Sequence, residues 1–95
     1  MFHHVIMLKL REPLTQQDHG EIIQECVKLQ DLPGLLSLEF VHNHSVRSPD
    51  YTHAFVSSFV DEAAHELYQQ TPLHIPLKEK VRQLAEGFVV LDYET

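Results

Sequence analysis

The sequence lacks the disulfide bonds and zinc-finger motifs that stabilise many small proteins. Cys26 is the only cysteine among 95 residues, so no disulfide can form within the chain. Histidine and cysteine do not fall at zinc-finger spacing, so no structural zinc of that kind is expected. A chain of this length buries a modest core, and oligomerisation is the common remaining source of stability. We therefore expect one domain, residues 1–95, that associates with itself.

Basic residues are scarce as well. Seven lysines and arginines stand against fourteen aspartates and glutamates, which gives a net charge of -7, and no basic run occurs. This charge argues against nucleic acid and anionic membranes as partners. The chain has no apolar run that could span a bilayer, and its start lacks the pattern of a signal peptide. We expect a cytoplasmic protein with neither a nucleic-acid nor a membrane partner.

Strand and helix periods alternate along the chain in a recognisable order. Thr15 and Asp18 resemble a capping box at the start of one helix. Asp61 is the predicted N-cap of a second helix, which Pro72 stops, and a third follows over residues 76–87. Four segments alternate with the strand period, namely residues 2–10, 35–43, 51–60 and 88–93. The order β-α-β-β-α-α-β predicts an α+β fold: a ferredoxin-like antiparallel sheet with helices on one face.

The helices can cover only one face of such a sheet. The opposite face would carry a row of apolar side chains, namely Val5, Met7, Ala54, Val56, Val89 and Leu91. An exposed apolar patch of this size is unfavourable in a monomer. The pattern therefore predicts a homodimer in which two helix-free faces pack together, a dimeric α+β barrel.

Tyr68 and His74 flank the turn at Pro72. A phenol and an imidazole six positions apart across a turn can converge, which makes them a candidate acid/base pair. His4 and His53 are internal to predicted strands, on a face with apolar neighbours, so we predict that both face the same pocket as Tyr68 and His74. The predicted substrate-binding residues are His4, Ile6, Leu8, Cys26, His53, Phe55 and Leu77.

Other interpretations of these residues stay open. Tyr68 can be a core aromatic, and each histidine can be a satisfied core residue. Three histidines can also hold zinc, but no carboxylate lies at an obvious companion position and the neighbours are apolar, so no metal is expected. Cys26 is either a small buried hydrophobe or, if it faces the pocket, a reactive thiol.

These motifs together resemble the stress-responsive α/β-barrel (Dabb) family of the dimeric α+β barrel superfamily. The resemblance runs nearly end to end through residues 4–10, 33–37, 51–53, 68–74 and 89–93. It implies a homodimer with one small-molecule pocket per subunit and no cofactor. The family includes olivetolic acid cyclase, a plant polyketide cyclase, whose tyrosine–histidine dyad corresponds to Tyr68 and His74. Its accessory pocket histidines correspond to His4 and His53.

The chain departs from that cyclase at the pocket walls. Cys26 stands in place of a tyrosine and Ala85 in place of a tryptophan. Thr71-Pro72 replaces the usual His-Pro, and Pro76 replaces a glycine. The resemblance therefore implies a different or larger acyl tail on any substrate.

Three functions follow from this resemblance. The first is a cyclase-like or lyase-like enzyme that uses the Tyr68–His74 dyad on a polyketide-like or other apolar carbonyl compound. The second is a non-catalytic, ligand-binding or stress-associated dimer. The third is a cofactor-independent or haem-degrading monooxygenase. It ranks last, since haem-degrading relatives use a tryptophan and this chain has none.

Overall fold

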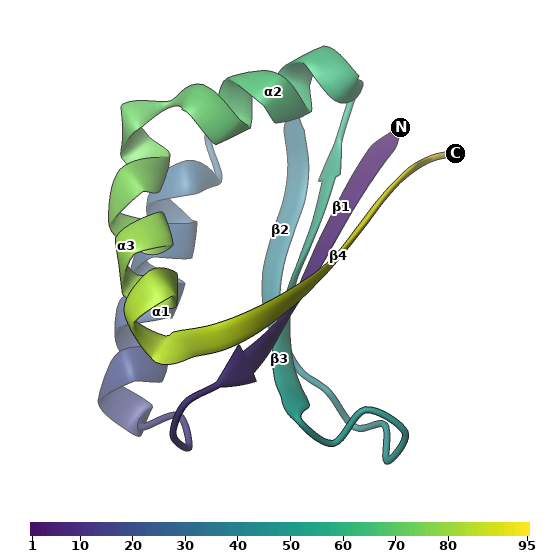
Figure 1. The fold of residues 1–95 in the computed structure, drawn as a ribbon. Coiled ribbons are helices and arrows are strands. Elements are labelled where there is room, and N and C mark those ends of the chain that lie inside the picture. Colours follow the sequence, from purple (N-terminus) through teal and green to yellow (C-terminus); the bar gives the residue numbers. More distant parts are fainter.

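A four-stranded antiparallel sheet carries all the helices on one face in the computed structural model, which describes residues 1–95 (Figure 1). The elements are β1 (Phe2–Leu10), α1 (Gln16–Leu29), β2 (Leu35–His42), β3 (Tyr51–Phe59), α2 (Glu62–Gln70), the 3₁₀ turn η1 (Pro72–His74), α3 (Ile75–Leu84) and β4 (Ala85–Glu94). The strands lie in the order β2-β3-β1-β4. The predicted ferredoxin-like α+β fold is confirmed.

α1 and α2 begin where the sequence predicts, and α3 begins one residue earlier, at Ile75. Thr15 Oγ1 accepts a hydrogen bond from the Asp18 amide at 3.1 Å, and the Asp61 carboxylate accepts one from the Ala64 amide at 2.9 Å. Each bond satisfies an amide that the first turn of a helix leaves free. The predicted end of α3 at Gly87 is wrong, because Leu10 on β1 pairs with Ala85. Strand pairing starts at Ala85, so residues 85–87 belong to β4 and not to α3.

Side chains from the sheet and the helices interleave in one core. Phe59 and Leu29 are fully buried at its centre. Gly34 has a φ of +83°, and a Cβ placed there would lie 2.5 Å from the Cβ of Ala64. Only glycine fits both this backbone conformation and this approach. The glycine thus lets α2 lie close to the start of β2.

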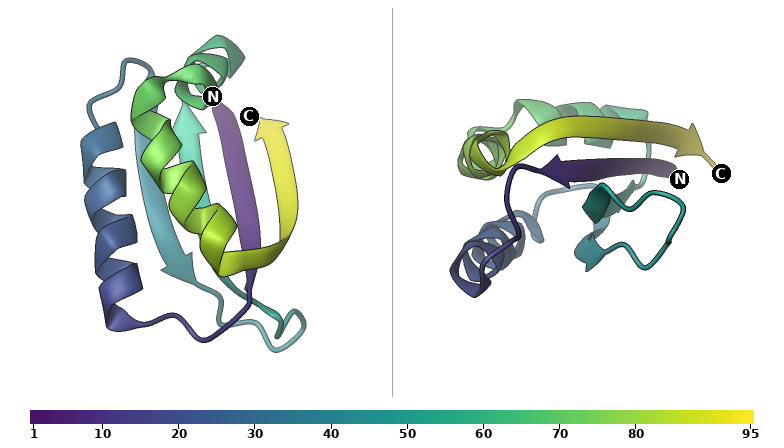
Figure 2. Two further views of the ribbon diagram at one scale, coloured as in Figure 1. Left: turned by 60° about the vertical axis from the view of Figure 1, so that its left-hand side comes forward. Right: turned by 60° about the horizontal axis from the view of Figure 1, so that its bottom comes forward.

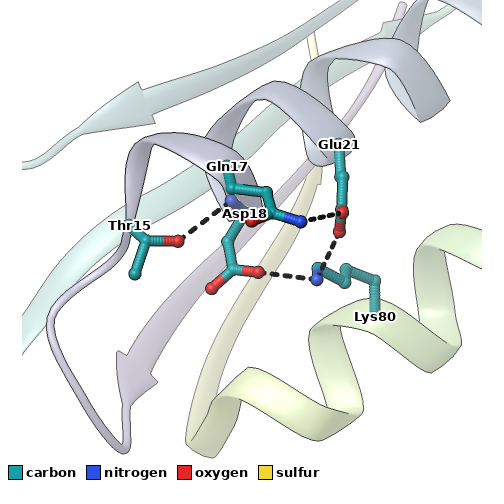
Figure 3. Close-up of polar contacts among 5 residues, drawn as sticks. All are labelled: Thr15, Gln17, Asp18, Glu21 and Lys80. Carbon is teal, nitrogen blue, oxygen red and sulfur yellow. Dashed lines mark hydrogen bonds and ion pairs between the residues drawn. The ribbon is translucent and has the colours of Figure 1, made fainter.

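A polar contact holds α3 against α1, which lie side by side over the sheet (Figure 2). Lys80 Nζ lies 2.7 Å from Asp18 and also contacts Glu21, as Figure 3 shows. These hydrogen bonds raise the pKa of Lys80 and lower the pKa of both carboxyl groups. The pairs are solvent-accessible and contribute little stability. They join the two helices at this one point.

The helix-free face of the sheet is apolar, as the alternation predicts. Val5 pairs with Val56 on β3 and with Leu91 on β4, and Met7 pairs with Val89. Directly paired residues project to the same side of a sheet. Leu91 is 57% exposed in the single chain, so this face has no cover of its own.

Candidate functional site

A cavity of about 400 Å³ lies between the helix-side face of the sheet and the segment from α2 to α3. Six of the nine predicted site residues line it: His4, Ile6, Phe55, Tyr68, His74 and Leu77. The cavity therefore brings both members of the predicted dyad together with one strand histidine and an apolar wall.

Three predicted residues lie outside the cavity wall. Leu8 and Cys26 are core residues, 1% and 4% exposed. Burial raises the pKa of the Cys26 thiol to about 11, so it stays protonated and has little thiolate character. His53 pairs with Leu8, whereas His4 pairs with Ser57. Four residues along a strand separate the two histidines by about 13 Å.

His53 instead belongs to a group of aromatic rings at the other end of the sheet. Its ring stacks on Phe40 at 5.3 Å between centroids and meets the edge of His42 at 5.1 Å. Its Nδ1 lies 2.8 Å from the Thr52 hydroxyl. The predicted placement of His53 in the pocket is therefore corrected: it shares a sheet face with His4, but not a cavity.

Tyr68 and His74 lie against each other across the junction between α2 and η1. Their ring centroids are 4.2 Å apart with the planes tilted by 39°, so the pair makes a stacking contact. Burial raises the pKa of the Tyr68 phenol, which keeps its proton. Burial, assisted by the positive charge of Lys78, lowers the pKa of His74 to about 4. The imidazole is therefore neutral at pH 7.

One atom of His74 stands out chemically. Its Nδ1 is buried and has no hydrogen-bond partner in the protein. Leaving a buried polar atom unpaired costs about 1–3 kcal/mol, and most such atoms in folded proteins are paired. His74 also lines the cavity, so this unpaired nitrogen belongs to a ring that borders the space.

His4 has partners that sequence reasoning missed. Its Nδ1 contacts the carboxylate of Asp92, and its ring lies 4.6 Å from the ring of His65. The statement that no carboxylate accompanies the histidines is therefore wrong. Asp92 pairs with His4 in the β1–β4 register, and His65 lies one helical turn before Tyr68. Local periodicity does not reveal a register between strands 88 residues apart.

The cavity wall carries positive charge. Lys78 and Arg82 line it, and no aspartate or glutamate does, although acids outnumber bases two to one in the chain. Lys78 Nζ donates to the Gln69 carbonyl at 2.7 Å, which fixes it beside the cavity. An apolar wall with two histidines, a phenol and two cations suits a small compound with an apolar body and a carbonyl or carboxylate group.

The family model described as "Stress responsive A/B Barrel Domain" matches residues 2–95. The chain belongs to the Dabb family. No curated protein matches the sequence of this Dabb protein.

Solved structures share its fold at low sequence identity. A Dabb family protein from Mesorhizobium loti has a TM-score of 0.81 and 22% identity, covering 99% of this chain and 95% of that one. A dimeric ferredoxin-like protein of unknown function from Thermobifida fusca has a TM-score of 0.83 and 18% identity, and the match covers 99% of this chain and 90% of that one. The hydroxynitrile lyase from Passiflora edulis has a TM-score of 0.80 and 21% identity, and the match covers 97% of this chain and 90% of that one. At these identities the likeness establishes the fold alone.

None of the helices combines the length and the apolar character of a membrane span. The resemblance to olivetolic acid cyclase stays a prediction.

Proposed function

We propose that this Dabb protein is an enzyme that performs acid/base chemistry on a small carbonyl compound bound in the cavity. The observation that carries the proposal is the buried, unpartnered Nδ1 of His74, in a residue that lines the cavity beside Tyr68. A neutral imidazole with a free nitrogen accepts a proton from a carbon acid. The dyad needs no cofactor for this step.

The proposed reaction moves one proton out of the substrate and back. His74 takes a proton from a carbon flanked by carbonyl groups, and the C–H electron pair becomes an enolate. The Tyr68 phenol, which stays protonated, donates a hydrogen bond to the enolate oxygen. The enolate carbon attacks a second carbonyl, and His74 returns its proton to the new alkoxide. The enolate charge beside the new imidazolium offsets the low basicity of His74.

His4 takes the role of an orienting group. Its contact with Asp92 fixes the ring where it meets the cavity. Ile6, Phe55 and Leu77 supply apolar surface for the body of the substrate. Linear β-keto acids of the polyketide type fit this description best.

Two comparisons support an enzyme of this class. The hydroxynitrile lyase from Passiflora edulis has the same fold, so a lyase site can be built on it. The resemblance of Tyr68 and His74 to the dyad of olivetolic acid cyclase favours an aldol-type cyclisation. Function depends on the site and not on the fold, so these likenesses rank behind the geometry of His74.

The test follows binding and turnover separately, with linear β-keto acids offered to the purified protein. We expect His74→Ala to lower turnover about 10²–10⁴-fold while ligand affinity changes little, because the lost contact acts mainly in the transition state. Tyr68→Phe should lower turnover while keeping the ring in place. His53→Ala is the matched control, because His53 lies outside the cavity and should leave turnover unchanged.

Binding of these compounds without conversion would favour the second function, a non-catalytic ligand-binding module. In that case His74→Ala and Tyr68→Phe would change affinity alone. Oxygen consumption in the presence of ligand would instead favour the monooxygenase.

We also propose that the protein is a homodimer through the helix-free face of the sheet. The exposed apolar side chains there and the dimeric relative from Thermobifida fusca support this assembly. Val56→Asp should dissociate or unfold the protein, because an unpaired ion in an apolar interface costs several kcal/mol. Sedimentation of the wild-type protein as a stable monomer would contradict the proposal.

A further inference from the structure

One buried histidine has no part in the proposed reaction. His65 on α2 is 9% exposed, and its ring packs against Phe2 at 4.8 Å and Phe59 at 5.1 Å. An imidazole is a costly choice for an apolar site, where a leucine would fill the same space without a polar atom to satisfy. The ring therefore calls for a chemical explanation beyond packing.

Two further side chains that bind metals in proteins lie next to it. His4 comes from β1 and Asp92 from β4, so three separate elements converge on one point. One potential ligand atom from each of His4, His65 and Asp92 lies within 4.8 Å of the other two. No other set of three histidine, cysteine, aspartate or glutamate side chains in the chain meets that condition. The histidines near the β2–β3 hairpin do not, although their rings touch.

The donor set has a definite chemical preference. Two imidazole nitrogens and one carboxylate oxygen are ligands that zinc takes in sites with an open fourth position. The carboxylate also neutralises half of the charge of a divalent ion. Asp92 has a side chain that is 42% exposed, which gives an ion a path in from solvent.

An outer partner also fixes the buried ligand. The side-chain amide of Gln69 lies 3.1 Å from Nε2 of His65. The atom nearest to the ring is the amide nitrogen. When the amide turns over, its oxygen takes that place and accepts from Nε2–H, as the outer partners of ligating histidines commonly do. Because this contact occupies Nε2, Nδ1 is the nitrogen of His65 that can bind a metal ion.

We propose that His4, His65 and Asp92 form a binding site for one divalent transition-metal ion of the zinc type per chain. His4 also lines the cavity, so the ion would lie at the cavity edge with a coordination position left for water or a ligand oxygen. The site is a property of the chain that does not depend on the proposed acid/base reaction, because it is defined by metal binding itself.

The experiment uses tag-free, full-length protein freed of metal with a chelator. Co²⁺ is titrated in while visible absorption reports its coordination by nitrogen and oxygen, and Zn²⁺ is then added to displace it. We expect saturation at one Co²⁺ per chain, followed by loss of the absorption with one Zn²⁺ per chain. Asp92→Asn and His65→Gln should each weaken binding by about 100-fold or more, since loss of an outer partner alone costs about 10–100-fold.

A control variant and a check on folding make the outcome decisive. The double variant His42→Gln/His44→Gln removes exposed imidazoles near the hairpin and should leave the titration unchanged. Asp92→Asn keeps the shape of an exposed side chain, so its circular dichroism and melting temperature should match the wild type. Absence of saturable binding at one ion per chain would overturn the proposal. Binding that survives Asp92→Asn and disappears in the hairpin double variant would also overturn it.

Discussion

Two groups of histidines lie on the helix side of one sheet, and their surroundings differ. The cavity-end group consists of His4, His65 and His74, and the hairpin-end group of His42, His44 and His53. Members of the first group contact side chains from distant elements, such as Asp92 and Tyr68. Members of the second contact one another and their strand neighbours.

The cause of this difference is the placement of the helices. α2 crosses one end of the sheet, near the N-terminus of β1, whereas the hairpin between β2 and β3 projects from the other end (Figure 1). Covering a sheet face with a helix encloses a space and removes water from the groups that line it. A common sheet face is therefore not sufficient for a common site, because position along the strand decides which helix covers a residue.

The largest expected effect comes from displacing α2, the helix that makes the cavity end distinct. Gly34→Ala forces a positive φ on a residue with a Cβ and places that atom 2.5 Å from Ala64. We expect a loss of about 2–5 kcal/mol in the free energy of unfolding, measured in urea. Gly20→Ala is the matched control. No atom lies within 4 Å of the added Cβ, so it should stabilise α1 by about 0.5–1 kcal/mol. Equal effects of the two variants would contradict the close packing of α2.

The free energy of unfolding should depend on pH through a buried histidine of the cavity-end group, and not through the exposed histidines of the hairpin-end group. The pKa of His74 is lowered to about 4 by burial and by Lys78, whereas an unfolded chain has a value of about 6.5. Between these values the unfolded chain binds a proton that the folded protein does not. The free energy of unfolding therefore falls as the pH drops from about 6.5 to about 4, by about 3 kcal/mol for His74.

Urea unfolding across this range measures the effect, and histidine resonances identify its source. His74→Gln should remove much of the pH dependence, whereas His44→Gln should keep it because that side chain is exposed. A His74 resonance that titrates near 6.5 would refute the burial argument.

Loss of a helix cap should affect the two ends of the sheet differently. Asp61→Ala removes the cap of α2 and Thr15→Ala removes the cap of α1, and each should cost about 1 kcal/mol. Amide hydrogen exchange distinguishes the effects of the two variants. Only Asp61→Ala should speed amide exchange around Tyr68, because α2 alone carries that residue. Faster exchange at Tyr68 in Thr15→Ala as well would mean that the helices open as one unit.

The smallest effect is expected at the hairpin end. His53→Ala removes a half-buried ring stacked on Phe40 and should cost no more than about 1 kcal/mol. Ligand affinity should stay at the wild-type value, because the side chain lies outside the cavity wall. A tenfold loss of affinity would place His53 at the binding site after all.

Local signals in the sequence determined most of the architecture. Alternation placed the four strands, and the caps at Thr15 and Asp61 placed the starts of two helices. These features act over a few residues, so they can be read directly. The same alternation predicted the apolar helix-free face. The contact between Tyr68 and His74 was predictable too, because a single turn at Pro72 separates them.

Only the tertiary structure decided which other side chains join the dyad. His53 shares the face of His4 but lies about 13 Å away along the strand, under different cover. Asp92 and His65 lie beside His4 because β4 pairs with β1 in one register and α2 crosses one end of the sheet. Register and helix placement result from packing between segments far apart in the chain, and no local period encodes them.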